Sequence, residues 1–227
     1  MSTESATTTL LWDGRTPAAR GPAATLSIEA IAAAGVAIAD EHGIGAVSMQ
    51  AVAESLGFTK MALYRHVRGK DELLAVMVEA AVEEVPRLDP RQPWRERITV
   101  FADALADVWR RHPWVPWVTR GRRLMGPREV AWVECALEPL VDTSLTPTER
   151  LDAVFLLFGH LRNTHSLDTA GTQPWHDPAL GERLRQSAEH YPALADLSSV
   201  GASEDNGRSF GLERILDGIE RLHESRA

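Results

Sequence analysis

The sequence predicts an all-α fold, and three observations support this prediction. From Ser27 onward, apolar residues recur at the three- and four-residue spacing of a helix face. No segment alternates β-branched or aromatic residues with polar ones, which is the pattern of a strand. Candidate caps, glycines and prolines mark where the periodic segments begin and end. With 227 residues, 44% of them hydrophobic and 25% charged, the chain is long enough to bury a core without cross-links.

Residues 1–25 show neither a helical nor a strand period and are rich in Ser, Thr, Ala, Pro and Gly. We interpret this segment as a mobile N-terminal arm. Its two basic residues, Arg15 and Arg20, leave two alternatives open, namely contact with the minor groove of DNA or a solvated tail.

Polar caps are expected to open the first three helices. Ser27 precedes a helix that Gly43 ends, and Ser48 precedes a short helix that Gly57 ends. Thr59 opens a third helix two residues later.

Prolines and acidic first turns place the remaining helices. Pro113 and Pro116 interrupt the helical period in the middle of the chain, and the Ser- and Gly-rich residues 198–209 are expected to be mobile. The later helices are expected at residues 70–85, 93–112, 127–141, 146–169, 177–190 and 210–224, with Gly171 after the fourth of these.

Residues 48–67, SMQAVAESLGFTKMALYRHV, have the architecture of a helix-turn-helix, with a short amphipathic helix, a turn and a second short helix. Gly57 permits the turn, because glycine adopts a positive φ at little cost. At about 100° per residue, the second helix turns Leu63 and Val67 inward and leaves the opposite arc free. That arc carries side chains suited to phosphates, base edges and thymine methyl groups: Met61, Tyr64, Arg65 and Arg68.

The charge distribution restricts where a polyanion can bind. The chain carries 24 basic and 32 acidic residues, so its formal net charge is −8 and the molecule as a whole is expected to repel nucleic acid and anionic membranes. Residues 58–70 hold four basic residues and no acidic one, which leaves −12 on the rest of the chain. A basic tip on an acidic body directs the molecule towards DNA through that tip.

Other features of the sequence exclude several classes of protein and site. Cys135 is the only cysteine, so an intrachain disulfide and a thiolate zinc cluster are excluded. Because there is no signal-peptide pattern and no apolar run of about 20 residues, we expect a cytoplasmic protein. His160 and His165 stand five residues apart rather than at the spacing of a helical metal pair, so we expect neither a metal nor a cofactor.

Residues 43–74, GIGAVSMQAVAESLGFTKMALYRHVRGKDELL, resemble the N-terminal DNA-binding domain of the tetracycline-repressor (TetR) family. The resemblance implies a helix-turn-helix DNA-binding domain over residues 26–72, followed by a helical effector-binding and dimerisation domain over residues 73–227. It rests on two linked patterns, Leu63-Tyr64-x-His66-Val67 and Gly69-Lys70-x-x-Leu73-Leu74.

The resemblance also implies roles for individual side chains. Tyr64, His66 and Lys70 would contact DNA phosphates. Four residues stand at recognition-helix positions, where a lysine or arginine reads guanine and an apolar side chain meets a thymine methyl group: Lys60, Met61, Ala62 and Arg65. The expected DNA-binding set is completed by the residues that begin the two helices: Ser48, Met49, Gln50 and Thr59.

Two later stretches, residues 144–161 and 210–219, resemble the regulatory domain of the same family. Residues 154–158 are apolar around the whole helix, so burying one face would leave another wet. The resemblance implies that these two helices pair with their copies in a four-helix dimer interface, and the alternative is that both form intrachain core. The expected interface residues are Val154, Phe155, Phe158, Leu212, Ile215, Leu216 and Ile219.

The middle helices combine tryptophans with scattered polar groups, which suits a small-molecule site, and the resemblance implies an effector there. Aromatic residues at helical spacing are also typical of a plain core. The expected effector-binding residues are Trp109, His112, Trp117, Arg120, Trp132, His160 and Asn163.

The sequence therefore predicts a homodimeric transcriptional regulator, namely a repressor that a small-molecule effector releases from a palindromic operator in double-stranded DNA. An activator or a ligand-independent regulator stays open as an alternative. So does an all-α enzyme that contains a helix-turn-helix, although there is no G-x-S-x-G elbow, no Gly-rich phosphate loop and no catalytic motif around Cys135. We therefore do not expect an enzyme.

Overall fold

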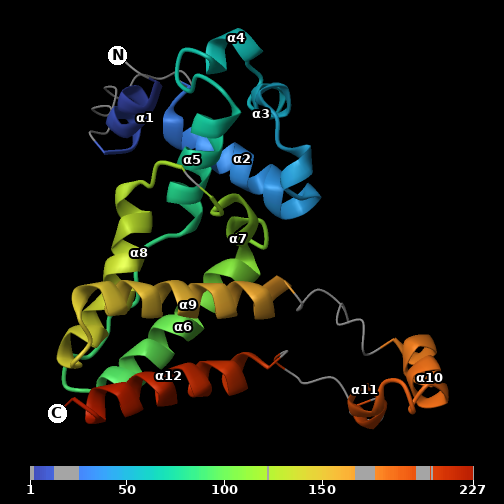
Figure 1. Cartoon of the computed structure of the whole chain (residues 1–227). Helices are drawn as coiled ribbons and strands as arrows, with labels where there is room; N and C mark the ends of the chain where they lie inside the picture. Colours follow the sequence, from blue (N-terminus) through green and yellow to red (C-terminus); the bar gives the residue numbers. More distant parts are fainter. Residues whose placement is uncertain are drawn as a thin grey trace. The chain divides into compact units, whose positions relative to one another are not determined.

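The computed structural model describes residues 3–12, 26–121, 123–166, 177–197, 205 and 207–226 (Figure 1). All regular structure among these residues is helical, which confirms the all-α prediction. None of the described helices is long and apolar enough to cross a lipid bilayer. The chain divides into two compact units, residues 1–139 and 140–227.

The first unit contains mostly short helices (Figure 1), and most of them contribute buried apolar side chains. Helices α2 and α5 pack closely at Gly35, where a Cβ atom would lie 2.7 Å from the Sδ of buried Met77, so that glycine permits the approach. The elements are α1 (Thr3–Trp12), α2 (Ile28–His42), the 3-10 turn η1 (Ile44–Ala46), α3 (Met49–Ser55), α4 (Lys60–Leu63), α5 (Lys70–Ala81), α6 (Trp94–Arg111), α7 (Val115–Val118) and α8 (Pro127–Leu137).

The predicted caps of α2, α3 and α4 are confirmed. The hydroxyl oxygens of Ser27, Ser48 and Thr59 accept backbone N–H groups three residues ahead, at 3.1, 3.0 and 3.3 Å. Gly43 and Gly57 follow α2 and α3 with φ angles of +79° and +72°, as the two predicted stops require.

Two helices of the first unit end earlier than their periodicity predicts. Helix α5 ends at Ala81 rather than at residue 85, because Glu83 adopts a φ of +53° and Pro86 disfavours helical geometry in the residue before it. Helix α8 ends at Leu137 and continues as the 3-10 turn η2 (Glu138–Asp142), since Pro139 has no N–H to donate to an α-helix.

Residues 3–12, expected to be part of an irregular arm, instead form helix α1. Its contacts lie far along the chain, because the Thr7 hydroxyl bonds to Glu72 and the Trp12 indole bonds to the carbonyl of Met125. Such tertiary contacts stabilise a short helix that has no strong pattern of its own. Arg15 and Arg20 lie outside the described residues.

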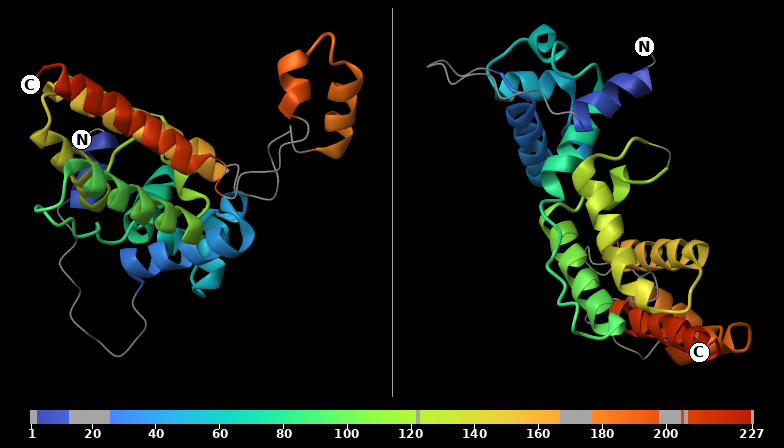
Figure 2. Two further views of the ribbon diagram at one scale, coloured as in Figure 1. Left: turned by 90° about the horizontal axis from the view of Figure 1, so that it is seen from below. Right: turned by 90° about the vertical axis from the view of Figure 1, so that its left-hand side faces the viewer.

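The second unit contains α9 (Pro147–Ser166), α10 (Pro178–Gln186), α11 (Pro192–Leu197) and α12 (Arg208–Glu224). Helices α9 and α12 run antiparallel and side by side (Figures 1 and 2). Helix α10 begins where the sequence predicts but ends at Gln186 rather than at residue 190, and Asp177 caps it by accepting the backbone N–H groups of Ala179 and Leu180 at 2.7 and 3.2 Å. Helix α11 was not predicted, and residues 167–176, 198–204 and 206, which include the expected stop at Gly171, lie outside the described residues.

Candidate nucleic-acid interface

Helices α3 and α4 form the helix-turn-helix that the sequence predicts. Val52, Leu63 and Val67 are fully buried, so the apolar sides of both helices face the core of the first unit. Gly57 lies in the turn between them, with the positive φ already described. The opposite side of α4 is therefore turned to solvent, where a second molecule can reach it.

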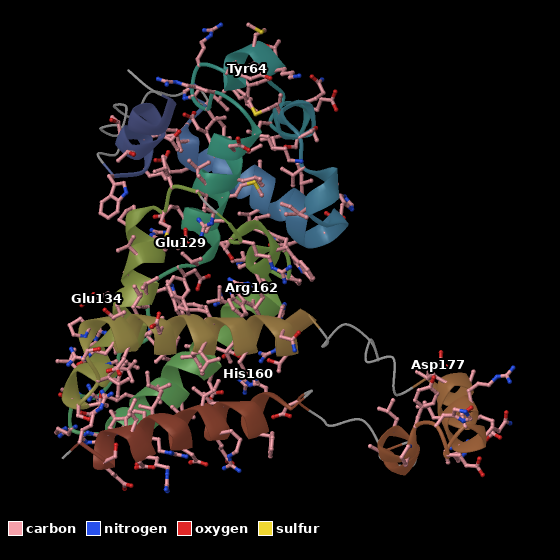
Figure 3. All side chains as sticks on the ribbon, viewed as in Figure 1. Tyr64, Glu129, Glu134, His160, Arg162 and Asp177 are labelled. Carbon is pink, nitrogen blue, oxygen red and sulfur yellow. The ribbon has the colours of Figure 1, made fainter. Side chains whose placement is uncertain are left out.

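The free side of α4 carries the predicted combination of cations and an aromatic ring (Figure 3). Met61 is 69% exposed and Tyr64 is 38% exposed, and the Nζ of Lys60 lies 5.7 Å from the centre of the Tyr64 ring. This face and the turn that follows it present four exposed cations: Lys60, Arg65, Arg68 and Lys70. Extended cationic side chains beside an aromatic hydroxyl suit both phosphates and base edges.

The other residues of the predicted DNA-binding set differ in how far they are exposed. Ser48, Gln50 and Thr59 are exposed, and the side-chain amide of Gln50 donates to Glu54 at 2.5 Å. Ala62 and His66 are half-buried. The expectation that Met49 approaches a DNA groove is wrong, because Met49 is only 6% exposed. It stands three residues before buried Val52, so both lie on the inner face of α3.

Glu72 is a residue of this region that the site prediction missed. The residue is only 5% exposed, and its Oε2 accepts the backbone N–H of Arg68 at 2.7 Å. The bond fixes the turn between α4 and the start of α5 at Lys70. An acid in the first turn of a helix that reaches back to the preceding backbone is a capping signal that the sequence does contain.

The other end of α5 is bonded to the start of α8. The two carboxylate oxygens of Glu79 accept the backbone N–H groups of Arg128 and Glu129, each at 3.1 Å. Burial raises the pKa of Glu79 above its ordinary value, although the N–H and charge of Arg128 act in the opposite direction. Helix α5 thus connects the basic turn at its first residue to the N-terminus of α8.

A third connection joins α2 to the segment that follows α6. Asp40 on α2 accepts the indole N–H of Trp114 at 2.7 Å, and its carboxylate lies 3.0 Å from Nδ1 of His112. His112 is one of the predicted effector-binding residues, and in this structure its ring contacts the first helix of the helix-turn-helix domain.

The other predicted effector-binding residues lie in several different surroundings. Trp109 and Trp132 are buried, and the Trp132 indole donates to the carbonyl of Val82 at 2.8 Å. Trp117 is exposed, and the Arg120 guanidinium lies 4.4 Å from the centre of a Trp117 ring. The role of these side chains in effector binding stays a prediction.

The two remaining predicted effector-binding residues belong to the second unit. The Nε2 of His160 lies 2.8 Å from the carbonyl oxygen of Arg208, so that His160 joins α9 to the start of α12 (Figure 3). A Cβ atom on Gly211 would overlap the His160 ring, which makes glycine necessary at this crossing. Asn163 is exposed.

The helix pair α9 and α12 carries exposed apolar side chains and a groove. Phe155 is 67% exposed, and Leu151 and Leu156 are exposed beside it on α9. A groove of about 440 Å³ follows the two helices. Its lining is mostly apolar, with acids and one arginine among it: Leu145, Glu149, Asp152, Ala153, Leu156, Arg214, Ile215, Gly218, Ile219 and Leu222.

The predicted dimer stripe divides into two sets in the structure. Val154, Leu212 and Leu216 are buried within the single chain, as the alternative of intrachain core predicts. The faces of α9 and α12 that carry these three residues are covered by the same chain. A partner can therefore contact only the neighbouring positions. The predicted residues that retain exposed surface are Phe155, Phe158, Ile215 and Ile219.

The start of α9 is bonded to Arg226, which follows the end of α12. Glu149 accepts the backbone N–H and the hydroxyl of Thr146 at 2.8 and 2.9 Å, an arrangement that closes the first turn of α9. The Arg226 guanidinium donates to both oxygens of the same carboxylate, each at 2.8 Å. The bond from Arg226, followed by those from Thr146, lowers the pKa of Glu149 to about 2.

Comparisons with known protein families match both parts of the chain. Residues 31–77 match the profile of the bacterial regulatory proteins of the tetR family, and residues 85–223 match that of the tetracyclin repressor-like C-terminal domain.

Two relatives are named as regulators. The HTH-type transcriptional repressor DrrR1 of Streptomyces coeruleorubidus is 33% identical over 235 residues, which cover 94% of this chain and 84% of that protein. An HTH-type transcriptional regulator of Saccharopolyspora erythraea is 30% identical over 178 residues, which cover 75% of this chain and 74% of that protein.

Solved structures of the TetR family protein ActR from Streptomyces coelicolor share the fold. Its complex with (S)-DNPA aligns with a TM-score of 0.77 at 24% identity and covers 88% of this chain and 100% of that chain. Its complex with actinorhodin aligns with a TM-score of 0.75 at 24% identity and covers 90% and 100%.

The Glu149 bonds predict a pH-dependent contribution to stability. Because the pKa of Glu149 is lowered from 4.5 to about 2, its bonds stabilise the fold above pH 4.5, and this contribution is lost as the pH falls towards 2. We expect Glu149→Gln to lower the melting temperature at neutral pH, and the difference from the wild type to shrink as the pH falls from 4.5 to 2. Thermal unfolding followed by circular dichroism measures it. A difference that stays constant over this range would contradict the assignment.

Proposed function

The chain belongs to the tetracycline-repressor family of bacterial transcriptional regulators, and from this premise we propose that it is a ligand-responsive repressor. In this proposal a homodimer binds a palindromic operator and leaves it when a small molecule binds. The observation that carries the proposal is the exposed basic face of α4 and of the turn before α5, on a chain whose net charge is −8. As a regulator of transcription it would act in the cytoplasm, where the bacterial chromosome lies.

The exposed side chains divide into two kinds of DNA contact. Lys60 extends from the free side of α4 and Arg65 from the turn that follows it, and both are proposed to read guanine in the major groove, with Met61 against a thymine methyl group. Phosphate contact is proposed for the residues at the edge of that face: Tyr64, His66 and Lys70. Lys70 is the first residue of α5, so the free amides of that helix add to its attraction for an anion.

The grooved side of α9 and α12 is proposed to form the dimer interface. A two-fold axis brings the same surface of both copies together, so each exposed apolar side chain needs a recess on the partner. Exposed Phe155 supplies a large side chain of this kind, and the neighbouring groove supplies a recess of about 440 Å³. The dimer would place two recognition helices on one face of DNA, about 34–36 Å apart.

The proposed effector acts through α5. The ActR structures contain (S)-DNPA and actinorhodin, which supports a small-molecule ligand for this chain as well. Helix α5 is bonded at one end to the start of α8 through Glu79 and at the other to the Arg68 turn through Glu72. A ligand that binds better to one position of α8 would therefore favour one position of the basic turn.

The enzyme alternative has little in the structure to support it. Both relatives are named as regulators. Burial, followed by the charge of Glu138, raises the pKa of the Cys135 thiol to about 11, so this cysteine stays in its less reactive thiol form at neutral pH. Turnover of a candidate ligand by the pure protein would revive the alternative.

Selection of bound duplexes from random double-stranded DNA tests the proposal. We expect a palindromic consensus whose affinity falls steeply with salt concentration. Lys70→Ala should weaken all duplexes evenly and lower the salt slope by about 1, because it removes a phosphate contact. Arg65→Ala should relax the preference at particular base pairs, at a cost of about 1–3 kcal/mol on the consensus. Fluorescence anisotropy measures these affinities.

Arg110→Ala is the matched control, because Arg110 is also exposed but lies on α6 and pairs with Asp107. It should leave both affinity and preference unchanged. If the wild-type protein yields no consensus at low salt, or if Lys70→Ala and Arg65→Ala bind like the wild type, the DNA-binding assignment of this face is wrong.

Phe155→Lys tests the dimer. Burying an unpaired cation in an apolar contact should weaken association by about 2 kcal/mol or more, roughly 30-fold in the dimer dissociation constant. Sedimentation over a series of protein concentrations measures this constant. Val100→Lys, at an exposed apolar position on α6, is the control and should associate like the wild type. Unchanged association of the Phe155 variant would place the interface elsewhere.

A further inference from the structure

Helix α1 lies outside both segments that match the family profiles, which cover residues 31–77 and 85–223. It is nevertheless bonded to a residue within each of them. The Thr7 hydroxyl donates to Oε1 of Glu72 at 2.8 Å, and the Trp12 indole N–H donates to the carbonyl oxygen of Met125 at 3.0 Å. The first bond places α1 against the start of α5 in the helix-turn-helix domain, and the second places it against the segment that precedes α8.

The bond from Thr7 gives the second carboxylate oxygen of Glu72 a hydrogen-bond donor. Thr7 is itself buried, and Glu72 is only 5% exposed. One carboxylate oxygen accepts the Arg68 N–H and the other accepts the Thr7 hydroxyl. A buried carboxylate whose oxygens are both hydrogen-bonded holds one orientation, whereas an unsatisfied oxygen carries a large desolvation cost.

The orientation of the Glu72 carboxylate matters because its Oε2 accepts the backbone N–H of Arg68. The Arg68 N–H belongs to the backbone between Tyr64 on α4 and Lys70 at the start of α5. If the Glu72 carboxylate turns towards water to satisfy an oxygen that has lost Thr7, its bond to Arg68 weakens. The backbone that sets the spacing of these side chains then becomes less ordered.

We propose that α1 supports the DNA-binding surface from behind, and that Thr7 is a positioning residue acting through Glu72 on the turn at residues 68–70. Thr7 does not touch DNA in this account. It keeps the basic turn ordered before DNA arrives, so that less ordering remains to be done on binding. The inference rests on the proposed function, because it concerns affinity for the same duplex.

The test compares isosteric variants of Thr7 in the full-length chain. Thr7→Val keeps the shape and removes the hydroxyl, and Thr7→Ser restores the hydroxyl. Thr8→Val makes the same chemical change at the neighbouring residue, whose side chain is exposed. The probe is the palindromic duplex that the wild-type protein selects, and the measurements are its dissociation constant and the hydrogen-exchange rates of the Arg68 and Ile31 amides.

We expect Thr7→Val to weaken binding roughly 3- to 10-fold, which is the effect of ordering one or two side chains on association. The Arg68 amide should exchange faster in this variant, while the Ile31 amide in the core helix α2 exchanges at the wild-type rate. Thr7→Ser and Thr8→Val should match the wild type in all three measurements. Trp12→Phe, which replaces the indole by a smaller aromatic ring and removes the bond to Met125, should weaken binding by less than Thr7→Val, because Met125 lies outside the turn at residues 68–70.

The outcomes separate the two proposals. If the wild-type protein selects no duplex, the proposed function fails and this inference falls with it. If the wild type binds and Thr7→Val binds equally tightly, the inference alone is overturned. Equal losses in Thr7→Val and Thr8→Val, or faster exchange of Ile31 together with Arg68, would likewise overturn it, because they indicate a general loss of stability.

Discussion

Helix α5 is the constraint on which the rest of the first unit depends. It carries two carboxylates that accept backbone N–H groups of other segments, Glu72 near its start and Glu79 near its end. Because a helix transmits a displacement of one end to the other, the turn at Arg68 and the start of α8 are held in a fixed relation. The close approach of α2 at Gly35 fixes the middle of the same helix. Recognition side chains are thereby presented from a supported frame.

This arrangement also explains how a chain with a net charge of −8 can carry a DNA-binding face. The cations are gathered on the exposed arc of α4 and on the following turn, whereas the apolar sides of α3 and α4 are buried. The acidic remainder opposes flat adhesion to a polyanion and leaves the basic tip as the point of attraction. Affinity is then concentrated in few contacts, so the order of the backbone that carries them has a large influence.

Local signals in the sequence predicted much of the fold and part of the site. The caps Ser27, Ser48 and Thr59 act within three residues of themselves, and short-range rules therefore located their helices. The inward side of α4 followed from Leu63 and Val67 in the same way. By that spacing Met49 belonged with Val52, and its burial was within reach of the sequence.

Long-range contacts account for what the sequence did not predict. Helix α1 depends on two hydrogen bonds whose partners are separated by 65 and 113 residues in the chain. No local pattern encodes contacts of this length. In α9, apolar residues surround the helix, so only tertiary packing decides that Val154 is buried and Phe155 exposed. The surroundings of Trp132 and His112 likewise depend on Val82 and Asp40, which lie 50 and 72 residues earlier in the chain. The dimer and effector residues are for that reason the least predictable part of the site.

The central claim is that DNA is bound by the segment from Ser48 to Lys70, held in place by α5. Hydrogen exchange of the full-length protein, measured by mass spectrometry with and without a selected duplex, tests it most directly. The account predicts that DNA slows exchange in residues 48–72 and leaves α6 unchanged. Slowing in α6 or α9 with no change in residues 48–72 would contradict it.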